Sequence, residues 1–342
     1  MSKTEAALRS QGVTVERFDP FETQIHEYDL LHVFSSHPNL CTLVEYADQV
    51  GVPAVVSPIY YDNVHEILQS PLRFARNAGN YPYSLKSVLS KSIEQVAPEK
   101  LVSALDPKKR LYDAAAALFP NSYREGELLQ RRFDAPSKKI HVVPNGVDER
   151  FTDATPAVFE ASYDAEDFVL MVCSIDPRKN LITALEALEG VGKDIVVIGS
   201  PRDGKEEDQR YAERFERTAS EISEKVYLLG HVDHESDLLA SAYAACDVFL
   251  LPSWFETPGL VALEAGLAGA KVAITKFGPT EEYFGDHVQY VDPTSKRSIR
   301  RGVQQAAREP DTLGLRERIE QNYLWRHVAT TTKSAYEKVI DD

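Results

Sequence analysis

The chain has 342 residues, of which 43% are hydrophobic and 27% are charged, and its formal net charge is −15. This length suits two domains of ordinary size, and so negative a charge argues against a nucleic-acid-binding protein. The sequence has no run of about eighteen uncharged apolar residues, so we expect no membrane-spanning helix. The scattered cysteines (Cys41, Cys173 and Cys246) show no C-x-x-C spacing, which disfavours a zinc site or a disulfide framework and favours a reducing cytoplasm.

The stretch 71–140 is basic in an otherwise acidic chain. It holds thirteen lysine and arginine residues against seven aspartates and glutamates. Such an excess fits either a solvated helical face, which is the commoner explanation, or a surface for an anionic partner. The partners that we keep as expectations are an anionic acceptor and peripheral contact with the inner face of the cytoplasmic membrane.

The first half of the chain alternates short apolar runs with segments of helical period, which predicts an α/β fold with a parallel sheet. The predicted strands lie at 13–18, 30–34, 53–57 and 139–143, and the predicted helices at 40–50 and 121–133. The chain itself opens on a helical pattern that stops at Gly12. Because a doubly wound half ordinarily opens on a central strand and a glycine-rich turn, we expect this half to lack its first strand.

A second alternating series follows a Pro-Asn-Gly break at 144–146. Its predicted strands lie at 168–172, 194–199, 225–230, 247–251 and 271–275, and its predicted helices around 180–189, 206–223, 235–245 and 258–268. We therefore predict two doubly wound, Rossmann-like domains that face each other across a cleft. The first covers residues 1–144 and the second residues 145–325, and 326–342 form a C-terminal helix that packs back toward the first domain.

The stretch LPSWFETPGLVALEAG (251–266) follows a predicted strand, at the edge of the sheet where α/β proteins bind their ligands. Thr257 suits the N-cap of the next helix, and Pro258 suits its first position. The free amides of Gly259 and Leu260 would then form an anion site at the N-terminus of that helix.

Two carboxylates flank this predicted anion site. Glu256 lies just before the predicted helix and Glu264 lies within it. Since carboxylates accept hydrogen bonds from hydroxyl groups, sugar rings on either side of a diphosphate would satisfy both. A second strand-to-helix turn, DPRKN (176–180), places Arg178 and Lys179 at the same edge of the sheet, where two cations would neutralise a leaving diphosphate.

Four motifs carry a resemblance to glycosyltransferase family 4, whose members are retaining, nucleotide-sugar-dependent enzymes of the GT-B fold. They are VVPNGVD (142–148), DPRKN (176–180), LLGHV (228–232) and FETPGLVALEAG (255–266), the last with the family's Glu-x7-Glu arrangement. Their order and spacing resemble the family across nearly all of residues 25–330. The resemblance implies a GT-B fold and a reaction that needs neither a metal nor another cofactor, and the sequence agrees in having no Asp-x-Asp.

The resemblance also implies roles for individual residues. Glu256 would bind hydroxyls of the donor sugar, and Glu264 would hold the nucleotide ribose. The groups that would bind the diphosphate are Arg178, Lys179 and the amides of Gly259 and Leu260. The base would lie near two loops, one at Gly199–Ser200 and one at Gly230–Val232.

The chain departs from the family at several positions. Ser174 stands where many members have an arginine, five residues before the motif lysine. The family's N-domain histidine is missing from SPIYYDN (57–63), where Tyr60 or Tyr61 takes its place. His37 is a further candidate for the acceptor side. The family's glycine-rich N-terminal loop is absent.

We therefore expect a cytoplasmic glycosyltransferase that moves a sugar, with retention, from a nucleoside-diphosphate donor to a hydroxyl of a glycan or lipid-linked acceptor. One alternative is a catalytically impaired relative that binds nucleotide as a partner subunit. Another is an epimerase or glycosidic phosphorylase of the same architecture. The two histidines of HVDHE (231–235) favour an ordinary polar loop over a metal site, because no third ligand lies near them in the sequence.

Overall fold

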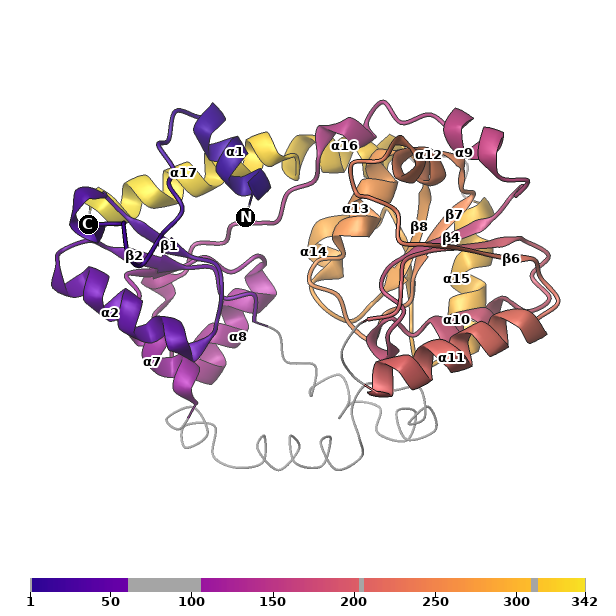
Figure 1. The fold of residues 1–342 in the computed structure, drawn as a ribbon, viewed down its shortest axis with the longest axis horizontal. Helices are drawn as coiled ribbons and strands as arrows, with labels where there is room; N and C mark the ends of the chain where they lie inside the picture. The colour runs from indigo at the N-terminus through magenta and orange to yellow at the C-terminus, as the bar shows by residue number, and fades with distance from the viewer. Residues whose placement is uncertain (1, 61–105, 203–205, 309–312, 342) are drawn as a thin grey trace. The chain divides into compact units, whose positions relative to one another are not determined.

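The computed structural model describes residues 2–60, 106–202, 206–308 and 313–341 (Figure 1). These residues form two compact units: unit 1 holds 2–60, 106–146 and 322–341, and unit 2 holds the others. Each unit is built on its own parallel sheet. Within the described ranges, no helix is both long enough and apolar enough to span a membrane.

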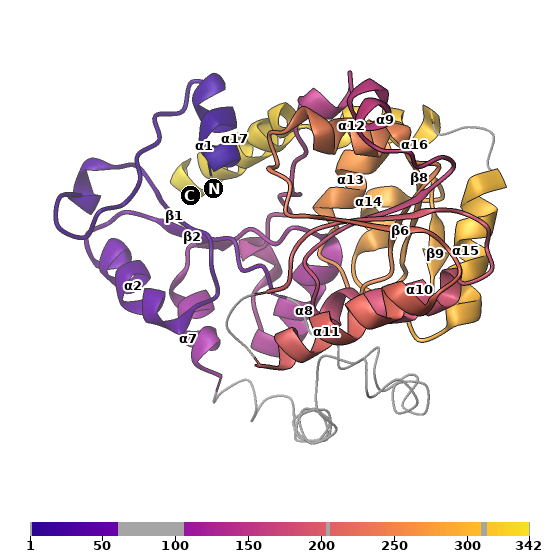
Figure 2. The same ribbon diagram turned by 45° about the vertical axis from the view of Figure 1, so that its right-hand side comes forward.

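The described part of unit 1 contains a parallel sheet in the order β1-β2-β3. Its strands are β1 (Leu31–Val33), β2 (Ala54–Val56) and β3 (Ala117–Leu118). Its helices are α1 (Ser2–Ser10), α2 (Cys41–Gln49), α7 (Pro107–Ala114), α8 (Tyr123–Phe133) and α17 (Trp325–Asp341), with 3-10 turns at Ile25–Glu27, Pro38–Leu40 and Ser137–Lys139. Figures 1 and 2 both show α1 beside α17, and these two helices pack together.

Successive residues of β2 face opposite sides of this sheet. Val56 belongs to a core that includes Val44 of α2 and Leu129 of α8. Val55 belongs to a second core that includes Ala335 of α17. Because side chains alternate along a strand, one short and fully buried strand holds helices on both faces.

Most elements predicted for this half are confirmed. The strands expected at 30–34 and 53–57 are β1 and β2, and the helices expected at 40–50 and 121–133 are α2 and α8. The opening helix is α1, and Gly12 follows it with a positive φ of 79°.

Two strand predictions in unit 1 are wrong. The segment 13–18 forms no strand, because its backbone pairs with α1: the Val13 N–H donates to Leu8 O (3.1 Å), and Arg9 donates to Val15 O (2.6 Å). The segment 139–143 runs beside β3, yet β3 is only two residues long, so pairing there is reduced to an isolated bridge between Ile140 and β3.

The described part of unit 2 contains a parallel sheet in the order β6-β5-β4-β7-β8-β9. Its strands are β4 (Val169–Val172), β5 (Ile195–Ile198), β6 (Val226–Gly230), β7 (Val248–Leu251), β8 (Lys271–Thr275) and β9 (Gln289–Val291). Its helices are α9 (Ala157–Ser162), α10 (Leu181–Leu188), α11 (Glu206–Glu221), α12 (Asp237–Ala245), α13 (Leu260–Leu267), α14 (Thr280–Phe284), α15 (Lys296–Arg308) and α16 (Leu313–Asn322), with 3-10 turns at Glu149–Phe151 and Pro177–Lys179. Every strand and helix predicted for this half is confirmed. The sequence analysis did not predict β9, α9, α14, α15 or α16.

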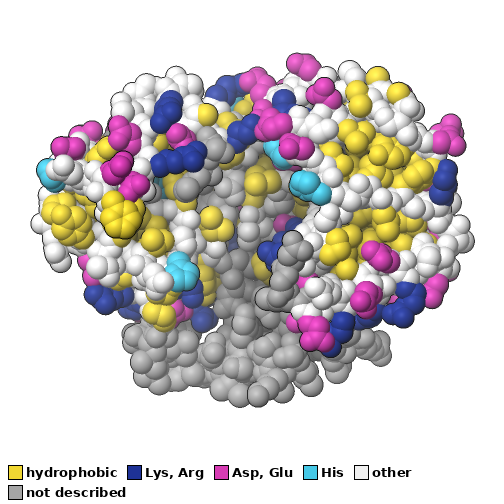
Figure 3. Space-filling model, in the orientation of Figure 1, with side chains coloured by type: hydrophobic (Ala, Val, Ile, Leu, Met, Phe, Trp, Pro, Cys, Tyr) yellow, Lys and Arg dark blue, Asp and Glu magenta, His cyan; other side chains and the backbone are white. Residues whose placement is uncertain are grey.

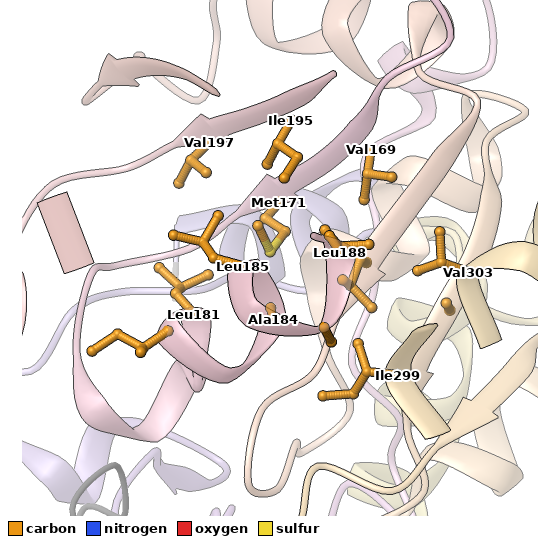
Figure 4. Packing of buried hydrophobic residues seen from close by; sticks show 14 of the residues in the cluster. Val169, Met171, Leu181, Ala184, Leu185, Leu188, Ile195, Val197, Ile299 and Val303 are labelled. Carbon is orange, nitrogen blue, oxygen red and sulfur yellow. The ribbon is translucent and has the colours of Figure 1, made fainter. Parts of the chain in front are cut away.

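Helices cover both faces of the unit 2 sheet (Figure 1). On one face, Met171 of β4 and Val197 of β5 pack against Leu185 of α10, with Ile299 of α15 in the same cluster (Figure 4). Burial of each such side chain stabilises the fold by about 1.5–3 kcal/mol. The other face carries α12 and α13, which pack against each other.

The order of the strands reverses between β4 and β7. The chain runs outward from β4 through β5 to β6, then returns to build β7, β8 and β9 on the other side of β4. The loops that follow β4 and β7 therefore leave the sheet in opposite directions at a topological switch point, which is where open α/β sheets bind ligands.

Candidate active site

The loop after β4 is shaped by its own short hydrogen bonds. The Asp176 carboxylate accepts from the Arg178 N–H (2.8 Å) and from the Ser174 hydroxyl (2.6 Å). Asp176 thus caps the 3-10 turn Pro177–Lys179, as a short acidic side chain does at a helix start. This cap fixes the backbone that carries both predicted cations.

Hydrogen bonds tie this turn to its neighbours. Asn180 has a left-handed backbone (φ 60°), and its side-chain amide donates to Pro252 O (3.1 Å) and Pro293 O (3.0 Å). In the reverse direction, the Trp254 N–H donates to Arg178 O (3.0 Å). The loops after β4, β7 and β9 are therefore held together at one edge of the sheet.

The loop after β7 is also held against the loop after β8. The Glu256 N–H donates to Phe277 O (3.1 Å). Gly278 has a φ of 107°, and a Cβ at this position would lie 2.0 Å from Glu256 O. Only glycine fits such a close approach, so Gly278, which the sequence analysis did not single out, positions Glu256.

Two cations meet one buried carboxylate at the switch point. Lys179 Nζ lies 2.6 Å from Glu256 Oε1, and the Arg178 guanidinium lies 3.8 Å from the same oxygen. The Lys179 and Glu256 side chains are buried, whereas 31% of Arg178 is exposed. The three groups together carry one net positive charge, and the looser, more exposed Arg178 can turn its donors to a second anion.

The cations also decide the ionisation of Glu256. Burial raises the pKa of this carboxyl, but the charges of Lys179 and Arg178 and the Lys179 hydrogen bond outweigh burial and leave the pKa below its ordinary value. Glu256 is therefore an anion at neutral pH, and it accepts hydrogen bonds.

The start of α13 differs from the prediction. The helix begins at Leu260, with Gly259 as its N-cap in a left-handed conformation (φ 94°). Thr257 is therefore not the N-cap and Pro258 is not the first helical residue; the peptide bond between them is cis. The amides of Leu260 and Val261, at the start of α13, have no hydrogen-bond partner among the described residues, as the first turn of a helix leaves them.

Glu264 lies one turn inside α13 and is buried. Its Oε2 accepts a hydrogen bond from the Tyr243 hydroxyl (2.9 Å), and its Oε1 lies 2.9 Å from His234 Nε2. Glu256 and Glu264 thus have separate hydrogen-bond partners.

His234 belongs to this site, although the sequence analysis assigned the histidines of 231–235 to an ordinary polar loop in preference to a metal site. It precedes α12, and Arg150 fixes its loop by donating to His234 O and Ser236 O (2.8 Å each). The hydrogen bond to Glu264 raises the pKa of His234 above its ordinary value. In the described ranges, no three His, Cys, Asp or Glu side chains come together as a metal site.

The loops expected near the base lie at the ends of β5 and β6. Gly199 has a φ of 146°, and a Cβ there would lie 1.8 Å from Cys173 O, so β5 ends in close contact with β4. Ser200 O accepts from the Ile175 N–H (2.9 Å), and the Gly199 N–H donates to Gly230 O (2.7 Å). Val232 is half-buried in the loop after β6.

The candidates in unit 1 belong to separate loops. His37 is exposed and caps the 3-10 turn Pro38–Leu40. Tyr60 is half-buried, and its ring lies edge-on to the ring of Phe133, with 5.2 Å between the ring centroids. The backbone N–H of Tyr60 donates to the Glu125 carboxylate. Tyr61 lies outside the described residues.

Unit 1 also holds two titratable side chains that the sequence analysis missed. Burial raises the pKa of Glu125 to about 7 and lowers the pKa of His32, on β1, to about 3. Glu125 lies three residues after the α8 N-cap Ser122, a capping-box spacing that marks a helix start rather than a buried acid. His32 lies within an apolar run of the sequence, and such a run does not reveal that the histidine is uncharged.

In the described part of the basic stretch 71–140, several cations serve unit 1 itself. Lys109 pairs with Asp113 (3.0 Å) and Arg110 with Glu45 (2.7 Å). Lys139 donates to Ala115 O (2.7 Å). These side chains are engaged within the fold.

Comparison with solved structures identifies the fold. Sucrose-phosphate synthase from Thermosynechococcus elongatus aligns with a TM-score of 0.68 at 17% identity, over 92% of this chain and 74% of that one. HepE from Anabaena, solved with UDP, aligns with a TM-score of 0.67 at 15% identity, over 92% of this chain and 79% of that one. The protein therefore has a GT-B fold of two parallel-sheet α/β domains.

Comparisons with protein families and with curated proteins also find relatives of this chain. Residues 157–323 match the family described as "Glycosyl transferases group 1". A D-inositol 3-phosphate glycosyltransferase from Mycobacteroides abscessus is 29% identical over 287 residues, which are 79% of this chain and 61% of that protein. One from Geodermatophilus obscurus is 31% identical over 247 residues, 67% of this chain and 54% of that protein. The chain thus spans less than two thirds of the length of these curated relatives.

Proposed function

We propose that the protein is a glycosyltransferase that moves a sugar from a nucleoside-diphosphate donor to a hydroxyl of its acceptor, with retention of configuration. The observation that carries this proposal is the meeting of Lys179 and Arg178 at Glu256, at a topological switch point beside the start of α13. The glycosyltransferase names of the relatives support it.

In this proposal, Lys179, Arg178 and the amides of Gly259 and Leu260 bind the donor diphosphate. They stabilise the charge that develops on the leaving group, without a metal ion, while the acceptor hydroxyl attacks from the same face. Preorganised donors of this kind are worth about 3–4 kcal/mol each in a transition state. Glu256 holds Lys179 through one oxygen, and a carboxylate has further lone pairs for hydroxyls of the donor sugar.

Glu264 is the proposed ribose ligand, with Tyr243 and His234 holding its carboxylate in place. The loops at Gly199–Ser200 and Val232 lie near the base. UDP is the first nucleotide to test, because HepE has been solved with UDP and with UDP-glucose.

We propose that residues 1–144 form the acceptor domain, that residues 145–325 form the donor domain, and that 326–342 form a C-terminal helix that packs back toward the acceptor domain. His37, Tyr60 and Tyr61 are the acceptor-side candidates. The relatives named for D-inositol 3-phosphate favour a phosphorylated acceptor, and a glycan or lipid-linked acceptor at the inner membrane face is the second candidate, through residues 71–140. The three cysteines are free thiols, which fits the proposed cytoplasmic location.

The alternative functions are not favoured by the comparisons, since the relatives carry glycosyltransferase names. An epimerase would convert its nucleotide sugar without any acceptor. A nucleotide-binding partner subunit would bind the donor and transfer nothing. The experiments below separate both from the proposed reaction.

The first test is thermal stabilisation by UDP, GDP and ADP, beside the variant Glu264→Gln. A ligand at a hundred times its Kd raises the free energy of unfolding by about 2.7 kcal/mol. We expect one nucleotide to raise the Tm of the wild type and to raise that of Glu264→Gln much less. No rise with any nucleotide, in a cooperatively folded sample, would count against the donor site.

The second test follows transfer directly. Wild-type protein is incubated with the stabilising nucleotide's glucose conjugate and D-inositol 3-phosphate, and products are separated by mass. A glycosylated acceptor that depends on Lys179 supports the proposal. Conversion of the donor without acceptor supports an epimerase, and binding without any product, over a panel of acceptors, supports a partner subunit.

A further inference from the structure

Glu125 is a buried acid that joins two loops at the carboxyl end of the unit 1 sheet. It lies in the first turn of α8 and is only 3% exposed. Its Oε1 accepts a hydrogen bond from the backbone N–H of Tyr60, in the loop after β2. Its Oε2 accepts one from the backbone N–H of Asn121, in the loop after β3 (2.6 Å). Because β2 and β3 are parallel neighbours, both loops leave the same edge of the sheet.

The carboxyl of Glu125 has no cationic partner among the described residues. Burial raises its pKa to about 7, although the two backbone N–H groups lower it. From α7, Tyr112 faces it: burial, and more weakly the charges of Glu125 and Asp106, raise the pKa of the Tyr112 hydroxyl. Lys108 pairs with Asp106 (3.6 Å) and lies 5.9 Å from the centroid of the Tyr60 ring. A buried carboxyl without a cation is costly and is typical of functional positions.

Ile59, next to Tyr60, has a strained backbone conformation. Its φ is 49°, which β-branched residues avoid. The other non-glycine residues with a positive φ in the described ranges are Asp134, Asp167 and Asn180, and Asp and Asn tolerate this conformation. Ile59 is also 61% exposed, but exposed hydrophobic side chains lie among charged ones on the face of unit 1 that Figure 3 shows. The exposure is therefore ordinary, and the backbone conformation is not.

Hydrogen bonds on both sides of Ile59 hold this conformation. Before it, the Ser36 hydroxyl donates to Pro58 O. After it, the Tyr60 N–H donates to Glu125. Strained backbone persists only where the surrounding structure holds it, and it is concentrated at ligand sites and switch regions.

We propose that Glu125 is a positioning residue of the acceptor side, which as a carboxylate clamps the loop 57–60 to the start of α8 and holds Ile59 in its strained conformation. The acceptor role of this loop rests on the proposed function, in which Tyr60 is an acceptor-side candidate. The clamp itself does not depend on that function.

Protonation of Glu125 would open the clamp. An ionised carboxylate accepts hydrogen bonds through both oxygens, whereas in the protonated acid one oxygen carries a hydrogen that would face an N–H donor. Asn121 leads directly into α8, whose start is capped by Ser122, so the loop 57–60 is the partner that moves. Because the pKa of Glu125 is about 7, this loop is ordered at alkaline pH and loosens below neutral pH.

The first test follows the clamp and needs no substrate. The full chain is labelled with ¹⁵N-tyrosine, and the backbone amide signal of Tyr60 is identified as the one that disappears in Tyr60→Phe. This signal is followed by NMR from pH 5 to pH 9 in the wild type and in Glu125→Gln, which cannot ionise at this position. We expect a titration with a midpoint near pH 7 in the wild type and a constant signal in Glu125→Gln. No titration in the wild type, or the same titration in both proteins, would overturn the proposal.

The second test separates positioning from a merely structural role. The KM for D-inositol 3-phosphate, the KM for the nucleotide sugar and kcat are measured for the wild type and Glu125→Gln. The two proteins are compared at the same pH, because the acceptor phosphate also titrates in this range. At pH 8 we expect the acceptor KM of Glu125→Gln to exceed that of the wild type about 3–10-fold, which corresponds to one hydrogen bond. The two values should converge by pH 6, with kcat and the donor KM unchanged.

The outcomes of the kinetic test distinguish the two proposals. An equal loss in all three parameters would give Glu125 a structural role only and overturn its positioning role. If the wild type glycosylates no acceptor, the proposed function fails and the acceptor role of the loop fails with it. The Tyr60 titration then still decides whether Glu125 clamps the loop.

The third test measures the strain at Ile59. Glycine adopts a positive φ freely, so Ile59→Gly should raise the Tm by about 2–4 °C. The matched control is Val158→Gly, at a 44% exposed β-branched residue within the helix α9, which should lower the Tm. A fall in the Tm of Ile59→Gly similar to that of the control would show that the loop is not strained and would overturn the proposal.

Discussion

Lys179 Nζ lies 2.6 Å from Glu256 Oε1, and the two side chains are only 10% and 8% exposed. They come from loops that follow different strands, 77 positions apart in the sequence. Removing one partner of a buried ion pair leaves an uncompensated charge, which costs far more than the pair contributes. This contact therefore contributes both to the stability of unit 2 and to the charge of the candidate site.

Lys179→Met should lower the free energy of unfolding by about 3–5 kcal/mol, because Glu256 would keep its charge in a buried position. The double variant Lys179→Met/Glu256→Gln should recover part of this loss, since it removes both charges. Urea denaturation of Lys179→Met, of Glu256→Gln and of the double variant measures the coupling energy between the two side chains. The control is Arg210→Ala, which removes an exposed pair with Glu206 and should change stability by less than about 1 kcal/mol. Strict additivity of the two single variants would contradict the buried pair.

Arg178→Ala should weaken nucleotide binding while leaving the fold largely intact, because this guanidinium is looser and more exposed than Lys179. Hydrogen bonds to charged groups contribute about 1.5–3 kcal/mol, so we expect the Kd for the stabilising nucleotide to rise about 10–100-fold. Isothermal titration calorimetry measures this Kd. Arg202 is a matched cation nearby, 61% exposed and 4.0 Å from Asp176. If Arg202→Ala weakened binding as much as Arg178→Ala, the assignment of Arg178 to the diphosphate would be wrong.

The hydrogen bond between His234 and Glu264 predicts a pH-dependent contribution to stability. A histidine whose pKa is raised on folding stabilises the native state fully below its unfolded pKa, about 6.5, and this contribution is lost as pH rises through the folded pKa. The Tm difference between the wild type and His234→Gln should therefore be largest below about pH 6.5 and shrink at alkaline pH. His231→Gln, in the same exposed loop, is the control. A difference that is constant from pH 5 to pH 9 would show that His234 does not bind Glu264 as a cation.

Gly278→Ala should destabilise unit 2 and disturb the candidate site together, because the new Cβ would lie 2.0 Å from Glu256 O. Gly269 has a similar φ of 94° and nothing within 4 Å of its Cβ position, so Gly269→Ala measures the backbone strain alone. We expect Gly278→Ala to cost about 1–3 kcal/mol more than Gly269→Ala and to weaken nucleotide binding. Equal destabilisation by both substitutions would mean that the loop after β7 relaxes freely.

Much of the fold could be predicted from the sequence. Buried strands such as 248–251 are short apolar runs, and helices such as α11 carry a clear helical period, so local patterns suffice for both. The short strands β3 and β9 were not predicted. The segment 13–18 has the alternation of a strand, but alternation alone does not create a neighbour to pair with.

For the site, the sequence by itself determined which residue types stand at the carboxyl ends of β4 and β7. A strand followed by DPRKN and another followed by FETPG are local facts, so Arg178, Lys179, Glu256 and Glu264 could be named as candidates. The start of α13 was misplaced because Pro258 and Thr257 have the propensities of a helix start, while the backbone of Gly259 decides where the helix begins.

Only the tertiary structure decided which of these side chains meet. The parallel order β5-β4-β7-β8 brings Lys179 to Glu256, sets Gly278 against the backbone of Glu256, and places His234 and Tyr243 on Glu264. Such contacts join residues far apart in the chain, and no local pattern encodes them. These contacts depend on the order of the strands in the sheet and on the burial of charged side chains and closely packed backbone. Both exist only once the sheet has formed.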